Sequence, residues 1–184
     1  KTGQFPLALE LVEYVLEREK NNVRALFTKS MVLRSLRRYS EALQVIDNAL
    51  KIDENNIRNL HGKSLILCDQ LDYDSKSNDV GYMEALGHIE AILRMDKNNI
   101  EALNVKSWIM IKFGEQNIGM YQTEPDSPEL PTGKNVLVYD VGLDCCNKVL
   151  SLDEHNFSAS YHKCVMLFDS EKYEQAIKLC EEMF

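Results

Sequence analysis

No run of apolar residues in this sequence approaches the roughly 20 that a membrane-spanning helix needs. No signal peptide is visible at its start either. Lys and Arg number 21 against 29 Asp and Glu, so the formal net charge is −8. A protein that holds a phosphate backbone needs a basic surface, and this charge balance disfavours one. We therefore expect neither a membrane nor a nucleic acid among the partners.

Paired cysteine spacings and common catalytic motifs are also absent. The five cysteines form no disulfide framework, which favours a reducing, intracellular and cytoplasmic setting. The four histidines include no His-x-x-x-His pair for zinc, and neither a Gly-rich phosphate loop nor a Gly-x-Ser-x-Gly motif occurs. Cys145 and Cys146 are neighbours that would point in different directions on a helix, so they make a poor chelate. We predict a protein that is not an enzyme and holds no metal or cofactor.

Proline is scarce, and three of the four prolines fall in one stretch. Pro125, Pro128 and Pro131 lie within residues 115–137, where we predict a long, mobile inserted loop because proline cannot continue a helix. Two roles remain open for this loop, a tolerated insertion and a clamp over a binding groove. A shorter, acidic insertion is predicted at about 72–81.

What the sequence does contain is a recurring helical pattern. Residues 39–56 predict one amphipathic helix, with Ala42, Leu43, Ile46 and Ala49 on or beside a single stripe. Five times along the chain an aromatic residue is followed three positions later by a tiny one. These pairs are Phe5 and Ala8, Tyr39 and Ala42, Tyr82 and Ala85, Tyr139 and Gly142, and Tyr173 and Ala176. Such a recurrence indicates an array of similar structural units.

Residues 23–56 form a unit of 34 residues, the length of a tetratricopeptide repeat. The residues that match the pattern of that repeat are Leu26, Ser30, Leu33, Tyr39, Ala42, Ile46 and Ala49. The chain therefore resembles the tetratricopeptide repeat family, and the resemblance covers nearly all of it. Lys29, where the family often has Leu, and Glu54, where it has Pro, depart from the pattern.

The resemblance implies an all-α fold. Its architecture would be an α-solenoid of antiparallel helix pairs, a right-handed superhelix with long inserted loops inside two repeats. We expect residues 1–184 to form a single array. Its divisions are a partial repeat at 1–22, repeats at 23–56, 57–99 and 100–156, and a partial repeat at 157–184. The predicted helices are 5–20, 23–36, 39–52, 57–71, 82–95, 100–113, 139–152, 157–169 and 173–184. Because the pattern begins and ends inside a unit, we expect a piece of a longer chain or a member of a multi-protein assembly.

Two sets of residues have predicted structural roles in this array. Four of the helices that open a unit are preceded by an asparagine whose side-chain oxygen can accept an orphan backbone N–H. These predicted caps are Asn22, Asn56, Asn99 and Asn156. Cys146, Cys164 and Cys180 lie at positions that the family uses for packing, where a free cysteine behaves as a small hydrophobe.

In the family, the first helix of each unit lines a concave side that binds peptides or partner helices. The candidate partner-binding residues at the corresponding positions are Arg24, Phe27, Met31, Arg58, His61, Leu65, Asn104, Trp108, Ile111, Tyr161 and His162. This set is more apolar and aromatic than a solvated surface, as interaction sites are. For Trp108, the only tryptophan, both the groove and the core between units stay open.

The sequence thus predicts a non-catalytic interaction scaffold that binds a peptide or helix of a partner protein along the concave groove. The basic residues Arg24, Arg34 and Arg58 either hold acidic side chains of that ligand or form a solvated face. Two alternative functions remain. The chain can be a regulatory or substrate-presenting segment of a larger enzyme, or a structural subunit of a large assembly.

Overall fold

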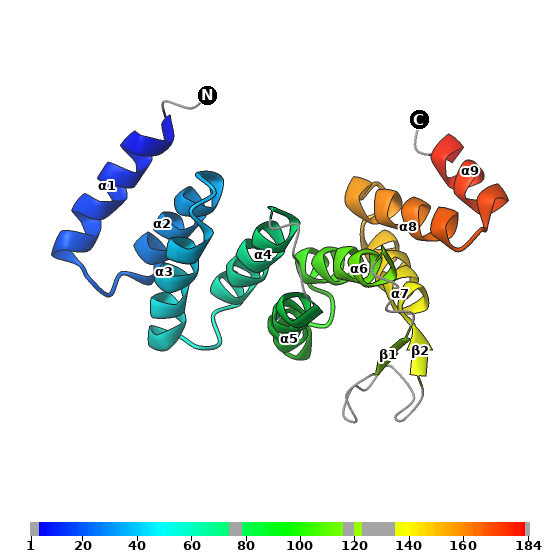
Figure 1. Ribbon diagram of the computed structural model, residues 1–184, viewed down its shortest axis with the longest axis horizontal. Helices are drawn as coiled ribbons and strands as arrows, with labels where there is room; N and C mark the ends of the chain where they lie inside the picture. The colour runs from blue at the N-terminus through cyan, green and yellow to red at the C-terminus, as the bar shows by residue number, and fades with distance from the viewer. Residues whose placement is uncertain (1–3, 74–78, 116–119, 123–134, 183–184) are drawn as a thin grey trace. The chain divides into compact units, whose positions relative to one another are not determined.

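The computed structural model describes residues 4–73, 79–115, 120–122 and 135–182. Within them the chain forms nine α-helices and one pair of short strands (Figure 1). It divides into two compact units, Lys1–Met95 and Asp96–Phe184. Unit 1 contains α1 (Gln4–Arg18), α2 (Val23–Ser35), α3 (Tyr39–Ile52), α4 (Ile57–Tyr73) and α5 (Asp79–Met95). Unit 2 contains α6 (Ile100–Glu115), β1 (Met120–Gln122), β2 (Asn135–Leu137), α7 (Val138–Leu152), α8 (Phe157–Asp169) and α9 (Tyr173–Glu182).

Helices that follow one another in sequence pack together within each unit. In unit 1 α2 packs on both α3 and α4, and in unit 2 α6 packs on both α7 and α8. The centre of unit 1 is formed by Leu33, Ala42, Ile46 and Ile66, which come from α2, α3 and α4. Ala42 is 0% exposed, so a larger side chain there would have to displace its neighbours. Close helix packing therefore explains why the tiny residue of the repeating pattern is needed.

Asparagine caps begin α2, α4, α6 and α8, which confirms the prediction. The cap oxygen accepts the N–H of the third residue after it: Asn22 from Ala25 at 2.9 Å, Asn56 from Asn59 at 3.1 Å, Asn99 from Ala102 at 3.0 Å and Asn156 from Ala159 at 3.0 Å. Each cap amide also donates to a carboxylate three residues earlier: Glu19 at 2.6 Å, Asp53 at 2.9 Å, Asp96 at 3.4 Å and Asp153 at 3.0 Å. This second contact, which the sequence analysis missed, holds the turn before each helix.

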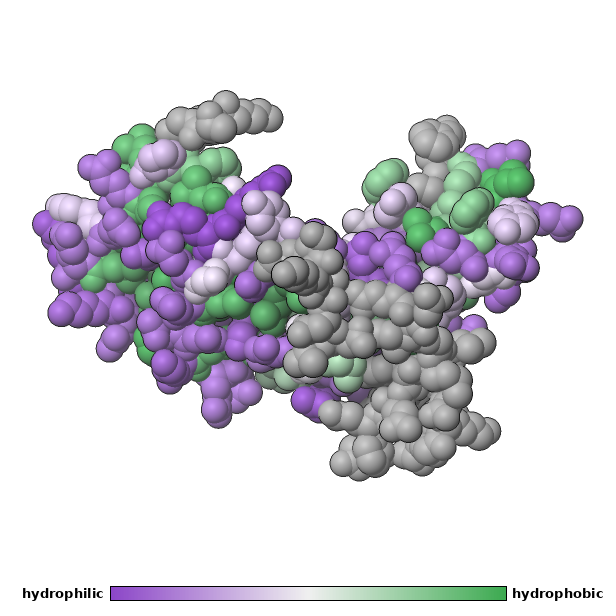
Figure 2. All heavy atoms as spheres, in the orientation of Figure 1, coloured by the Kyte–Doolittle hydropathy of each residue, from purple (hydrophilic) through white to green (hydrophobic). Residues whose placement is uncertain are grey.

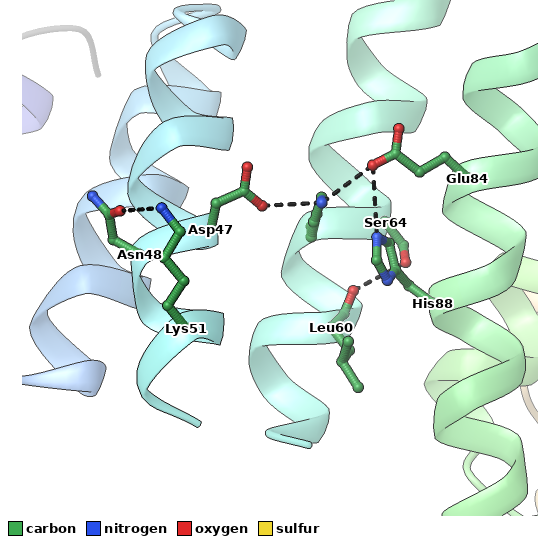
Figure 3. A network of polar contacts seen from close by, with 8 residues as sticks. Asp47, Asn48, Lys51, Leu60, Ser64, Glu84 and His88 are labelled. Carbon is green, nitrogen blue, oxygen red and sulfur yellow. Dashed lines mark hydrogen bonds and ion pairs between the residues drawn. The ribbon is translucent and has the colours of Figure 1, made fainter. Parts of the chain in front are cut away.

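Lysines on α2 and α4 join neighbouring helices through ion pairs. The Nζ of Lys29, the residue that departs from the repeat pattern, lies 2.8 Å from Glu13 on α1. The equivalent Lys63 on α4 lies 3.0 Å from Asp47 on α3 and 3.1 Å from Glu84 on α5. Figure 3 labels these two acidic residues. Burial acts to lower the pKa of Lys63, but its hydrogen bonds to the two carboxylates outweigh burial and raise that pKa. A charged residue replaces Leu here because a carboxylate on the adjacent helix can reach it.

The predicted bounds of the insertion, about 72–81, are wrong at both ends. Helix α4 continues to Tyr73 and α5 begins at Asp79, so both helices extend into it. The phenol of Tyr82 donates to Asp72 at 3.1 Å, which ties the last turn of α4 to the first turns of α5. This tertiary contact was not evident from a run of acidic and polar residues. Residues 74–78 lie outside the described residues.

The predicted loop at 115–137 is also corrected in part. Two three-residue strands, β1 and β2, pair antiparallel within it, with Tyr121 opposite Val136. Strands of three residues carry too little periodicity to be predicted from sequence. Residues 116–119 and 123–134, with the three prolines, lie outside the described part of the chain. The predicted mobility and the clamp role therefore remain predictions.

Candidate functional site

The α2 and α4 helices present one candidate face in unit 1. Phe27 and Met31 on α2 are half-buried and lie over Gly62 of α4. A Cβ added to Gly62 would come within 2.9 Å of Phe27 Cε2 and 3.2 Å of Met31 Cε. The guanidinium of Arg58 lies 5.5 Å from the centroid of the Phe27 ring. Candidate residues from two helices are thus brought together on this face, and the missing side chain at Gly62 allows it.

One of the positive charges on this face is neutralised by a carboxylate of the same unit. Arg34 Nε donates to Asp69 Oδ2 at 2.7 Å, which joins α2 to α4. Arg24 and Arg58 are exposed, whereas His61 and Leu65 are half-buried. Of the three predicted basic residues, Arg34 is therefore already paired with a carboxylate of its own unit.

Helix α6 supplies the second candidate face, in unit 2. Trp108 is half-buried, and the Nζ of Lys112 lies 5.4 Å from the centroid of its ring. One turn earlier, Asn104 Nδ2 donates to Oδ1 of the cap Asn156 at 3.2 Å, which ties α6 to the start of α8. The indole is therefore neither sealed in the core nor fully exposed.

Two of the candidate residues are buried between helices of unit 2. Ile111 is 4% exposed and His162 is 9% exposed. The Nδ1 atom of His162 lies 2.7 Å from the hydroxyl oxygen of Ser107 on α6, and the two share a hydrogen bond. Burial lowers the pKa of His162 to about 4, so the ring is neutral at pH 7. His162 thus joins α8 to α6, and both buried side chains offer little surface to a partner.

Helix α8 carries a row of exposed aromatic rings, which we name the α8 aromatic stripe: Phe157, Tyr161 and Phe168. They are 68%, 54% and 61% exposed. The rings of Phe157 and Tyr161 stack with centroids 6.5 Å apart, and Phe168 meets Tyr173 of α9 edge to face at 5.4 Å. Green and pale spheres lie over α8 and α9 in Figure 2. An exposed apolar surface of this kind usually marks an interaction site.

The candidate residues predicted from sequence included Tyr161 but not Phe157. The spacing in the sequence could have predicted the stripe, because residues four and eleven positions after Phe157 fall on the same side of a helix. Phe157 was missed because it directly follows the cap Asn156, where we expected only a helix start.

The described residues contain no cluster of three His, Cys, Asp or Glu side chains that could hold a metal ion. Among the same residues, no helix combines the length and the apolar character that crossing a membrane requires.

No family model matches this chain, and no curated protein matches it in sequence. Solved structures do match it. A tetratricopeptide repeat protein from Parabacteroides merdae superimposes with a TM-score of 0.72 at 15% identity, over 99% of this chain and 60% of that one. The chain has the tetratricopeptide repeat fold. This confirms the predicted fold class, an all-α α-solenoid of antiparallel helix pairs.

Two solved structures of MamA share this tetratricopeptide repeat architecture with the chain. MamA from Desulfovibrio magneticus RS-1 is 18% identical, with a TM-score of 0.72 over 99% of this chain and 85% of that one. A second MamA structure is 12% identical, with a TM-score of 0.68 over 99% of this chain and 88% of that one. In the repeat division predicted from the sequence, α2, α4, α6 and α8 are the first helices of their units and α3, α5, α7 and α9 the second.

Proposed function

We propose that the protein is a non-catalytic interaction scaffold that binds a peptide or helix of a partner protein through its first helices. The α8 aromatic stripe is the observation that carries this proposal. Helix α8 packs against α6, which carries the half-buried Trp108. In unit 1 the face of Phe27 and Met31 provides a second place for apolar contact. Aromatic residues, Met and Arg are the types enriched where proteins bind one another.

The aromatic rings of α8 are held in place before a partner arrives. Phe157 stacks on Tyr161 with the two planes 8° apart, and Phe168 rests against Tyr173. Binding therefore costs less side-chain entropy than it would for isolated exposed rings. A ligand that covers the stripe gains the burial of large apolar surfaces, and the Tyr161 hydroxyl remains available as a polar contact at the edge.

Replacing Tyr161 by Ala tests this proposal. Peptides of about a dozen residues would first be selected from a display library on the full chain, and their affinities measured by calorimetry. We expect Tyr161→Ala to weaken binding at least about tenfold, because a truncated hot-spot aromatic typically costs more than about 1.4 kcal/mol.

Tyr14 on α1 provides the matched control, since it is 56% exposed against 54% for Tyr161. Tyr14→Ala should leave the affinity unchanged, because Tyr14 is not on a first helix of the array. Equal losses for the two variants, or no loss for Tyr161→Ala, would show that the peptides bind elsewhere.

A structural role in a large assembly is a second candidate, favoured by the outer face of α1. Leu7, Leu11 and Tyr14 are 57%, 61% and 56% exposed on successive turns of that helix. Sizing of the purified chain separates the two functions. Self-association that Leu11→Ser abolishes would favour the assembly, and a monodisperse monomer would favour the scaffold.

A further inference from the structure

Two thiols face each other across the last helix pair. Cys164 of α8 and Cys180 of α9 are 16 positions apart in sequence, and their Sγ atoms lie 2.9 Å apart. A disulfide bond has a length of about 2.05 Å, so the two sulfurs need approach each other by only about 1 Å to become bonded. This pairing was not evident when each cysteine was treated as a separate packing residue.

The repeat explains why these two side chains meet. Cys164 occupies the position of Ser107 in the preceding helix pair, and Cys180 occupies that of Cys146. There, too, the side chains lie near each other: burial raises the pKa of the Cys146 thiol to about 12, and the neighbouring Ser107 hydroxyl acts to lower it. The two positions thus face each other in consecutive units, and the last pair is the one in which both residues carry sulfur.

Exposure distinguishes this pair from the other thiols. Cys68, Cys145 and Cys146 are buried, whereas Cys164 and Cys180 are each partly exposed. A small reagent in solution can therefore reach the α8–α9 pair while the other three cysteines remain enclosed.

We propose that Cys164 and Cys180 form a site of reversible thiol oxidation that takes a low-molecular-weight disulfide as its oxidant. One thiolate attacks the small disulfide, which forms a mixed disulfide and releases one small thiol. The second thiolate then attacks the protein sulfur of the mixed disulfide, which closes the Cys164–Cys180 bond and releases a second small thiol. In the net reaction two protein thiols are oxidised to a disulfide and one small disulfide is reduced to two thiols.

The site reacts slowly at neutral pH and faster in base. The hydrogen bond with Cys180, together with burial, raises the pKa of Cys164 to about 11. Little Cys164 thiolate is present at pH 7, and the thiolate is the attacking species. Below that pKa, attack by Cys164 becomes about tenfold faster for each unit of pH.

The test is to incubate the full native chain with oxidised glutathione at pH 8.5, alkylate the remaining thiols and digest with trypsin. We expect mass spectrometry to find the tryptic peptide 164–172 joined to the one that begins at Leu179, two hydrogens lighter than their sum, with the three buried cysteines reduced. Dithiothreitol should separate the joined peptides.

Two variants make the result specific. Cys146→Ser should retain the joined peptides, because that thiol is buried and outside the pair. Cys164→Ser, which introduces the residue found at the equivalent position of the other units, should abolish them and leave Cys180 as a mixed disulfide with glutathione. The proposal is overturned if both native thiols remain alkylatable, or if either one joins a different cysteine.

Discussion

Acidification from pH 7 to pH 4.5 is expected to lower the free energy of unfolding of unit 2 by about 2–3 kcal/mol through His162 alone. In the folded chain burial lowers the pKa of this histidine to about 4, whereas an unfolded histidine titrates near 6.5. Between these values the unfolded chain binds a proton that the folded chain does not. Stability contributed by the neutral ring is therefore present above pH 6.5 and is lost as the pH falls toward 4.

Urea unfolding at both pH values, for the native chain and for His162→Gln, measures this contribution. Other groups that titrate between these pH values contribute equally to the native chain and to the variant. Their contributions therefore cancel when the pH dependence of one protein is subtracted from that of the other. His155, whose side chain is 89% exposed, supplies the matched control. We expect His162→Gln to remove most of this pH dependence and His155→Gln to leave it intact. A native pH dependence retained in His162→Gln would contradict the burial of that ring against Ser107.

Two helical glycines are expected to respond to alanine with opposite signs. A Cβ on Gly142 of α7 would lie 2.3 Å from Met166 Sδ and 3.0 Å from Met110 Cβ. Both methionines are 0% exposed and have little room to move. Gly142→Ala should therefore lower the free energy of unfolding by about 2 kcal/mol, after allowing for the better helix propensity of alanine.

Gly87 of α5 meets no atom within 4 Å of an added Cβ, and it is exposed. Gly87→Ala should therefore raise the free energy of unfolding by about 1 kcal/mol through helix propensity alone. Thermal and urea unfolding of the two variants beside the native chain give both values. Stabilisation by Gly142→Ala would mean that α7 does not pack against α6 and α8 as closely as described.

The sequence predicted those features of the fold that depend on local chemistry. Helix α3 begins at Tyr39 and α8 begins at Phe157, as predicted, because an aromatic-and-tiny pattern and an asparagine cap mark these starts locally. The extra residues at the end of α4 and the start of α5 were missed because the contact between Asp72 and Tyr82 becomes visible only when the two helices lie side by side.

The candidate site was predicted less completely, since exposure depends on tertiary packing. The family resemblance that placed Tyr161 on the lining side of a first helix also placed Ile111 and His162 there, yet both of the latter are buried. His162 lies against Ser107 of α6. Whether a side chain on a helix faces solvent or the next helix depends on crossing geometry, which a single sequence does not report. The partner-binding roles of the remaining candidate residues stay predictions.

Fluorescence of Trp108 tests the proposed scaffold function most directly, because this residue is the only tryptophan and lies on α6, the helix that packs against α8. A selected peptide without tryptophan would be titrated into the full chain while its emission is recorded. We expect the emission to shift to shorter wavelength as the ligand covers the half-buried indole, with a midpoint that matches the calorimetric affinity. Tight binding with unchanged emission would place the ligand away from the first helices of unit 2 and contradict the proposal.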